Sequence, residues 1–312
     1  MTHVAFAAQA VGSDPSRGDI VVGIDGSAVA ERALAWACRE AKCRHLRVHV
    51  VHVWHSPLVA TGPTTPAVIG DLRRVVRHHA DYVLSTALDQ ACGAVEMRGS
   101  LHQGEPAPLL TAVAADADQL VVGDRGHGRV SRALLGSVGS AVAHRAHVPV
   151  TVVRGEWAAR RGAVVVGVDG SAASRRALAR AAAEADCRGS RLIVVGAWQI
   201  TSPDLLDEFA GWRLPPQDEL HRHAHDRVAA AVHETLPDRD DVEVRCMHAS
   251  PARALLDAAA DADLLVVGSR GLGAFDRLLL GSVANACLHR SPCPIQIVPP
   301  SDRGEPDPHD LA

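Results

Sequence analysis

The sequence predicts two tandem α/β domains, each a parallel β-sheet with helices on both faces. Short β-branched runs alternate with helical segments, a pattern typical of parallel sheets covered by helices. The second half of the chain also repeats the first. VVVGVDGSAASRRALARAAAEADCRG at 164–189 matches VVGIDGSAVAERALAWACREAKCRH at 21–45. A chain of 312 residues is long enough for two such domains.

Copy one begins with the strand DIVVGI at 19–24, which ends in a polar turn that contains Asp25 and Ser27. Ser27 is a good N-cap, and apolar residues recur after it at helical spacing, so a helix over 28–43 is expected. The β-branched run at 46–54 predicts the second strand. Three prolines between His55 and Gly70 predict a loop of a length that is often functional.

The remaining elements complete a five-stranded domain. Pro106 suits the first turn of a helix. In copy two the segment 203–236 reads as a helix interrupted at Pro215-Pro216, because proline has no amide donor and disfavours helix before it. The further elements expected in copy one are helix 71–92, strand 95–102, helix 106–116, strand 119–123, helix 136–147 and strand 149–153.

The domain limits follow from the repeat and from the composition of the segments around it. The expected order is a flexible N-terminal segment 1–17, domain one at 18–155, a polar linker at 156–162, domain two at 163–300 and a flexible tail at 301–312.

Composition limits the classes of partner. The net charge is −4, and the arginines are scattered among acidic residues, which argues against a nucleic acid partner. The N-terminus does not resemble a signal peptide, and no apolar run approaches ~18 residues, so a cytoplasmic protein without a membrane partner is expected. Seven cysteines without a CxxC pair favour reduced thiols over disulfides.

A glycine-spaced segment occurs once in each copy. GDRGHGRVSRALLGS at 123–137 and GSRGLGAFDRLLLGS at 268–282 share the spacing Gly-x2-Gly-x9-Gly-Ser. With strand order 3-2-1-4-5, the loops after strands one and four lie side by side at the carboxyl edge of the sheet, where ligands bind. Asp25 would therefore lie beside the glycine segment of copy one, and Asp169 beside that of copy two.

These residue types together describe a nucleotide cradle. Glycines at 123 and 126 can take positive φ and let the backbone approach a ligand. The Gly136-Ser137 pair opens a helix whose N-terminus favours phosphate. An acid after strand one can accept hydrogen bonds from ribose or hold a metal. The alternative is that the glycines only make tight turns and that Ser137 and Ser282 only cap helices.

The glycine pattern after a VVG strand, with a VGxDGS turn and a terminal PV or PI strand, resembles the universal stress protein family. The likeness covers 18–155 and 162–299 and is closest to the tandem, ATP-binding members common in actinobacteria. It implies flavodoxin- or Rossmann-like domains of the adenine nucleotide alpha hydrolase type. It also implies an ATP-binding stress and dormancy regulator that signals to a regulatory protein partner. A slow ATPase and a nucleotide-free interaction module are the alternatives.

The resemblance also implies the ATP contacts, possibly with Mg²⁺ on Asp25 and Asp169. Val53 and Ala197 correspond to positions where the backbone of strand two meets adenine. Asp124 replaces the serine found at 269 and is expected to weaken site one unless Arg125 or a metal offsets its charge. Gly139 and Ala284 lack a hydroxyl that some members have. The implied contacts are Asp25, Val53, Gly123, Gly126, Gly136, Ser137 and Val138, and Asp169, Ala197, Gly268, Gly271, Gly281, Ser282 and Val283.

Other candidates have simpler interpretations. Only His221 and His225 of the tract 221–225 share a helix face, so a solvated face is favoured over a metal site. His144 and His289 fit packing or capping. No catalytic residue is expected, because Ser27 and Ser171 have no paired base. The fifth strands pair between domains in the resembled family, which implies an intramolecular pseudo-dimer, with a homodimer as the alternative.

Overall fold

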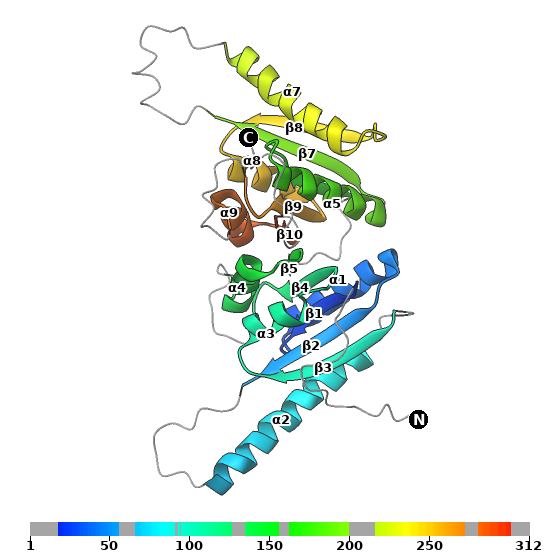
Figure 1. Ribbon diagram of the computed structural model, residues 1–312, viewed down its shortest axis with the longest axis vertical. Helices are drawn as coiled ribbons and strands as arrows, with labels where there is room; N and C mark the ends of the chain where they lie inside the picture. The colour runs from blue at the N-terminus through cyan, green and yellow to red at the C-terminus, as the bar shows by residue number, and fades with distance from the viewer. Residues whose placement is uncertain are drawn as a thin grey trace, which may run out of the picture. The chain divides into compact units, whose positions relative to one another are not determined.

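The computed structural model describes residues 18–55, 66–90, 93, 95–126, 135–155, 162–199, 216–271 and 280–300, without the side chains of 66–69. The chain divides into two compact units, Met1–Val153 and Arg154–Ala312. Each unit alternates strands and helices along the chain (Figure 1).

Unit one contains a parallel sheet in the order β3-β2-β1-β4-β5, which confirms the predicted order 3-2-1-4-5. The central strand β1 pairs with β2 on one side and β4 on the other, so that Val22 lies between Val50 and Val121. Strand β1 is buried on both faces, as its uninterrupted apolar sequence predicts. The strands are β1 Ile20–Ile24, β2 Val48–Trp54, β3 Met97–Gln103, β4 Gln119–Gly123 and β5 Val150–Val153.

The helices of unit one cover both faces of the sheet. Helix α1 packs on β1 and β4, α2 packs on β2 and β3, and α3 contacts α4. Right-handed parallel crossovers place α1 and α2 on one face and α3 and α4 on the other. The helices are α1 Ala28–Arg44, α2 Pro66–Asp89, α3 Pro106–Val113 and α4 Ser137–Arg145.

The loop expected at 55–70 is too long. Helix α2 begins at Pro66, not at residue 71. The fixed φ of proline and its missing amide suit the first turn of a helix, so this proline starts the helix instead of excluding it. Residues 56–65 lie outside the described part of the chain.

Unit two has the same topology, in the order β8-β7-β6-β9-β10. Its helix α7 begins directly after Pro216, in agreement with the predicted interruption, whereas 203–215 lie outside the described residues. The elements are β6 Ala163–Gly167, α5 Ala172–Arg188, β7 Arg191–Trp198, α7 Gln217–Thr235, β8 Val242–His248, α8 Pro251–Ala258, the 3₁₀ helix η1 Ala259–Asp261, β9 Leu264–Gly268, α9 Ser282–Arg290 and β10 Ile295–Val298.

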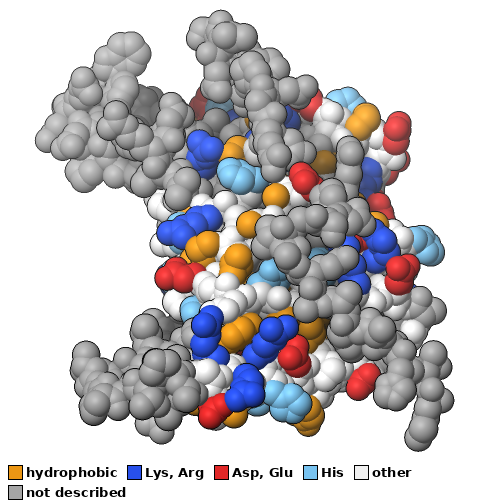
Figure 2. Space-filling view, turned by 60° about the horizontal axis from the view of Figure 1, so that its bottom comes forward, with side chains coloured by type: hydrophobic (Ala, Val, Ile, Leu, Met, Phe, Trp, Pro, Cys, Tyr) orange, Lys and Arg blue, Asp and Glu red, His pale blue; other side chains and the backbone are white. Residues whose placement is uncertain are grey.

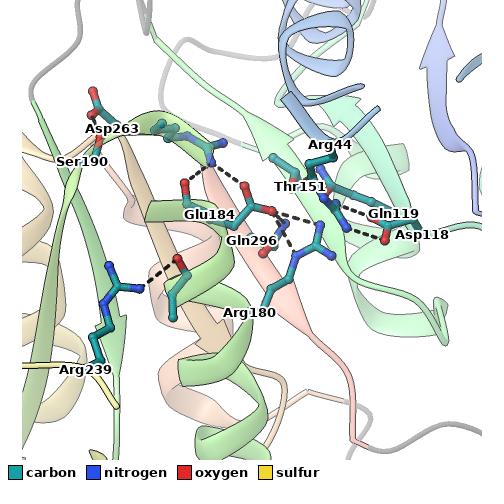
Figure 3. Close-up of polar contacts among 12 residues, drawn as sticks. Arg44, Asp118, Gln119, Thr151, Arg180, Glu184, Ser190, Arg239, Asp263 and Gln296 are labelled. Carbon is teal, nitrogen blue, oxygen red and sulfur yellow. Dashed lines mark hydrogen bonds and ion pairs between the residues drawn. The ribbon is translucent and has the colours of Figure 1, made fainter. Parts of the chain in front are cut away.

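Several buried polar groups within each unit are paired (Figure 3). In unit two the Glu184 carboxylate on α5 is 1% exposed and accepts hydrogen bonds from Arg180 at 3.0 Å, from Gln296 at 3.3 Å and from Arg188. In unit one the Gln119 amide donates to the Thr151 hydroxyl at 2.9 Å. Such pairing is needed because an unpaired buried charge costs several kcal/mol.

The cysteines depart from the expectation of reduced thiols. Cys38, Cys43 and Cys187 are disulfide-bonded, whereas Cys246 and Cys287 have free thiols. An odd number of cysteines excludes only complete pairing. Burial raises the pKa of Cys287 to about 12, so its thiol stays protonated.

The surface carries both signs of charge. On the face in Figure 2, basic and acidic side chains are interspersed over the described residues, so this part shows no continuous basic stripe. None of the described helices is long and apolar enough to cross a membrane.

Candidate functional site

The first part of the candidate site is the turn after the first strand of each unit. In unit one, Oδ1 of Asp25 accepts a hydrogen bond from the Ser27 amide at 3.0 Å, and Gly26 has a φ of 84°. In unit two, Asp169 accepts from the Ser171 amide at 2.9 Å. Both turns thus hold the carboxylate in one place at the carboxyl edge of the sheet.

Each turn is followed by a capped helix. Ser27 Oγ accepts from the Ala30 amide and Ser171 Oγ from the Ser174 amide, both at 3.2 Å. The predicted N-cap role of Ser27 is therefore confirmed. The caps fix where α1 and α5 begin and so fix the acidic residue just before them.

The loop after the fourth strand touches this acid in both units. A Cβ on Gly126 would lie 2.2 Å from Oδ2 of Asp25, and a Cβ on Gly271 would lie 2.5 Å from Oδ2 of Asp169. Only glycine allows the backbone to approach a carboxylate this closely. The structure therefore brings together the predicted aspartate and the second glycine of the motif, twice.

The first and third glycines of the motif serve close packing. A Cβ on Gly123 would lie 2.6 Å from Val29 of α1, and one on Gly268 would lie 3.1 Å from the Ala173 carbonyl. Gly136 approaches the backbone of residues 124 and 125 in a similar way. Gly123 and Gly126 could take positive φ, but neither lies in the left-handed region. Space, and not backbone conformation, requires these glycines.

The helices after the glycine segments begin with a glycine cap. Gly136 and Gly281 are the N-cap residues of α4 and α9. Their amides donate hydrogen bonds to the backbone carbonyls of Asp124 and Ser269, both at 2.7 Å. Ser137 and Ser282 are the first helical residues, so the alternative that these serines cap the helices is wrong. The hydroxyls of both serines are exposed, and Val138 and Val283 follow them half-buried.

The first amides of α4 belong to Ser137 and Val138, and those of α9 belong to Ser282 and Val283. All four residues are among the contacts predicted from the sequence. A glycine cap has no side chain that could accept a hydrogen bond from them. The N-terminus of a helix with this arrangement favours an anion.

The two units differ at the residue after the fourth strand. Asp124 is buried, and its Oδ2 lies 3.3 Å from Nε of Arg125, so the expected charge offset by Arg125 is present. Ser269 is 4% exposed, and among the described residues its hydroxyl has no hydrogen-bond partner. A buried hydroxyl without a partner is costly, and a ligand can satisfy it.

Strand two contributes its last residues to the same edge. Ile24 pairs with His52, so Val53 lies level with Asp25, and the same register in unit two brings Ala197 level with Asp169. Beside Ala197, the Trp198 ring stacks on His248 with centroids 4.2 Å apart. Trp198 Nε1 also donates to Nδ1 of His221 at 3.4 Å.

This aromatic cluster was not predicted from the sequence. The parallel register pairs Trp198 with His248 across the strands, and the pairing depends on residues about 50 positions apart. In unit one Trp54 pairs with Gln103, so the stack belongs to unit two.

The remaining histidine candidates have structural surroundings. His223 is exposed, and its Nε2 lies 3.8 Å from Glu219 on the same helix. Among the described residues, no group of three or more His, Cys, Asp or Glu side chains is arranged to hold a metal ion. His144 Nδ1 hydrogen-bonds to the Ser140 carbonyl at 2.7 Å, in line with the capping interpretation.

Comparison with known proteins decides the family. The universal stress protein family model matches residues 17–154 and again 161–299. The chain belongs to the universal stress protein family. A universal stress protein of Mycolicibacterium smegmatis is 33% identical over 290 residues, which is 90% of this chain and 97% of that protein. One from Mycobacterium tuberculosis is 34% identical over 287 residues, 88% of this chain and 95% of that protein.

A solved universal stress protein has the same fold. The crystal structure of one from Archaeoglobus fulgidus has a TM-score of 0.62 at 19% identity and covers 92% of this chain and 97% of that one. In this universal stress protein, the conserved architecture thus positions two equivalent clusters at the carboxyl edges of two equivalent sheets.

Proposed function

We propose that each unit of this universal stress protein binds one adenine nucleotide, ATP with Mg²⁺, and that occupancy regulates a protein partner during stress or dormancy. The close approach of the motif glycine to the aspartate after strand one, found at Gly126 and again at Gly271, carries this proposal. In both units this contact joins the two segments that the proposal assigns to the nucleotide.

The residues present fit such a ligand. Asp25 and Asp169 would accept hydrogen bonds from ribose hydroxyls or hold the cation that accompanies the phosphates. The Ser137 and Ser282 hydroxyls and the amides that follow would bind phosphate oxygens at the helix N-termini. Backbone groups of Val53 and Ala197 would meet the adenine. The glycines at 123, 126, 136, 268, 271 and 281 allow the close packing that shapes the cradle.

The chemistry favours binding over turnover. Lys42, on helix α1, is the single lysine of the chain, so neither glycine segment carries the lysine of a Walker loop. Fast phosphoryl transfer depends on such positioned cations and on a group that orients the nucleophile. Any hydrolysis should therefore be slow, in keeping with a regulator.

The direct test is to identify what the purified protein carries. Heat-released small molecules should include an adenine nucleotide by mass spectrometry, and calorimetry with ATP and Mg²⁺ should give two sites per chain. A protein that binds no adenine nucleotide with Mg²⁺ present would overturn the proposal.

Exchanging the residues that follow strand four between the two units tests which site binds nucleotide more tightly. Asp124→Ser should raise nucleotide affinity at site one by about tenfold, equal to about 1.4 kcal/mol, because it removes a negative charge near the phosphates. Ser269→Asp should lower affinity at site two by a similar factor. Two-site calorimetry on both variants measures the effect, and a change of opposite sign would contradict the placement of the phosphates.

Pairing of the two fifth strands within one chain stays a prediction, as does the alternative homodimer. Light scattering distinguishes the two in solution, because a single chain has a mass of 32.8 kDa.

A further inference from the structure

A pocket in unit one lies between helices α1 and α2. Its cavity volume is about 200 Å³, and part of it is open to solvent. Its apolar wall includes Ile24, Ala30 and Leu34 on one side and Val83 and Ala87 of α2 on the other. A mainly apolar lining with a few polar groups is typical of small-molecule sites.

The pocket differs from the proposed nucleotide cradle. The cradle consists of backbone and glycines of the loop after β4, whereas this pocket extends along two helices as far as Gln90 near the end of α2. Asp25 is the residue that the two share. The pocket therefore adjoins the cradle at Asp25 and extends from there along the helical face of the sheet.

The charges around the pocket are acidic. Asp25 and Glu31 supply two carboxylates at the α1 side, and His79, Thr86 and Gln90 supply polar groups on α2. No lysine or arginine is present among the described lining residues. An apolar wall with carboxylates at the lip is complementary to a cation attached to an apolar body.

An aromatic ring completes the rim. Tyr82 lines the pocket and is 64% exposed. The exposed large apolar residues of the described chain, Leu72, Val75 and Tyr82, all lie on α2. Exposed apolar side chains gathered on one element mark a surface that contacts a ligand or partner. A tyrosine ring beside carboxylates also attracts an ammonium group through its π face.

Unit two differs at the equivalent helix position. Arg175 occupies the fourth position of α5, as Glu31 does in α1. Its guanidinium donates to the Gly170 carbonyl at 2.8 Å and lies 3.9 Å from Glu234 of α7. The Arg227 stem lies 3.7 Å from where a Cβ on Gly170 would be. Basic side chains therefore bridge α5 and α7 where unit one has an acidic opening.

We infer that the α1–α2 pocket of unit one binds a small organic cation with an apolar body, such as an aryl-alkyl amine. The Glu31 carboxylate binds the cationic group, and the apolar wall and Tyr82 contact the body. The pocket meets the nucleotide cradle at Asp25 and extends away from it, so this ligand is a second input to unit one.

The tyrosine provides a local probe for the test. Tyr82 is the single tyrosine of the chain, so selective isotope labelling of tyrosine gives the ring signals of one residue in NMR spectra. The full-length protein is titrated with 2-phenylethylamine, and with 2-phenylethanol and 3-phenylpropionate as neutral and anionic analogues of similar shape. The amine should shift the Tyr82 signals and bind at least fivefold more tightly than either analogue.

Variants at the pocket opening test which residues contribute to amine binding. Glu31→Gln should weaken amine binding several-fold, and Glu31→Arg combined with Gln90→Glu should abolish it by placing an ion pair like that of unit two across the opening. The Arg is compatible with the fold, since unit two has one at that helix position. Arg175→Glu in unit two is the matched control and should leave the Tyr82 shift unchanged.

Four results would overturn the inference. These are Tyr82 signals that do not move with 10 mM amine, equal binding of the three probes, unchanged binding by the double variant, and complete displacement of the amine by saturating AMP. The last would show that the pocket is part of the nucleotide site. Nucleotide binding is measured separately by calorimetry, so a failure of the amine inference can be distinguished from a failure of the proposed nucleotide binding.

Discussion

Replacing both Gly126 and Gly271 with alanine should remove nucleotide binding from the protein. The added methyl groups would lie 2.2 and 2.5 Å from Oδ2 of Asp25 and Asp169, well inside van der Waals contact. Neither carboxylate can turn away freely, because Oδ1 of each is held by the amide two residues later. The loop must therefore move away from the cradle, and affinity should fall about 100-fold at each site, about 2.7 kcal/mol.

The single variants make this result specific. Gly126→Ala alone and Gly271→Ala alone should each lower the calorimetric stoichiometry with ATP and Mg²⁺ from two to one. Gly70→Ala is the matched control, since nothing lies within 4 Å of its Cβ position and alanine suits a helix better than glycine. If the double variant keeps two sites while its thermal unfolding is unchanged, the cradle has been placed wrongly.

Unit one should lose stability in mild acid because of His49. Burial, together with the charges of Arg98 and His102, lowers the pKa of His49 from 6.5 to about 4. Its Nε2 hydrogen-bonds to the Ser100 hydroxyl at 2.8 Å. As the pH falls below 6.5, the unfolded chain takes up a proton that the folded chain excludes until about pH 4. The free energy of unfolding should therefore fall by about 3 kcal/mol between pH 6.5 and 4.

The corresponding residue of unit two supplies the test variant. Ile193 of β7 pairs with Val165 of β6 as His49 of β2 pairs with Val21 of β1, and the sequence repeat aligns Val165 with Val21. His49→Ile should therefore flatten the pH dependence of unit one in urea unfolding at pH 7, 5 and 4. His55→Ala, at an exposed position, is the control and should retain it. If the free energy of unfolding of the His49→Ile variant depends on pH as it does in the original protein, another group causes the loss of stability in acid.

Elements that are defined locally could be predicted from the sequence. The strands at 119–123 and the helix start after Ser27 have the predicted bounds, because apolar runs and a capping serine act within a few residues. The order 3-2-1-4-5 also followed, since alternating strands and helices leave few topologies. The pairing of each aspartate with a motif glycine followed in turn from that order.

Features that depend on distant packing could not be predicted. The Trp198–His248 stack needs the register between two strands, and the α1–α2 pocket needs the spacing of two helices. The same applies to the disulfide-bonded cysteines and to the unpartnered hydroxyl of Ser269. The predicted helix start at residue 71 is wrong because the helix begins at Pro66, and a proline can begin a helix as well as exclude one.

The turns after β1 and β6 also bear on which cation the proposed sites would accept. Oδ1 of Asp25 and Oδ1 of Asp169 each accept a backbone hydrogen bond, which engages one lone pair of that oxygen. Calcium commonly takes a bidentate carboxylate and six to eight ligands, whereas magnesium keeps most of its water and takes single oxygens. A carboxylate held in this way would offer a cation single oxygens more readily than a chelating pair, which suits the smaller ion.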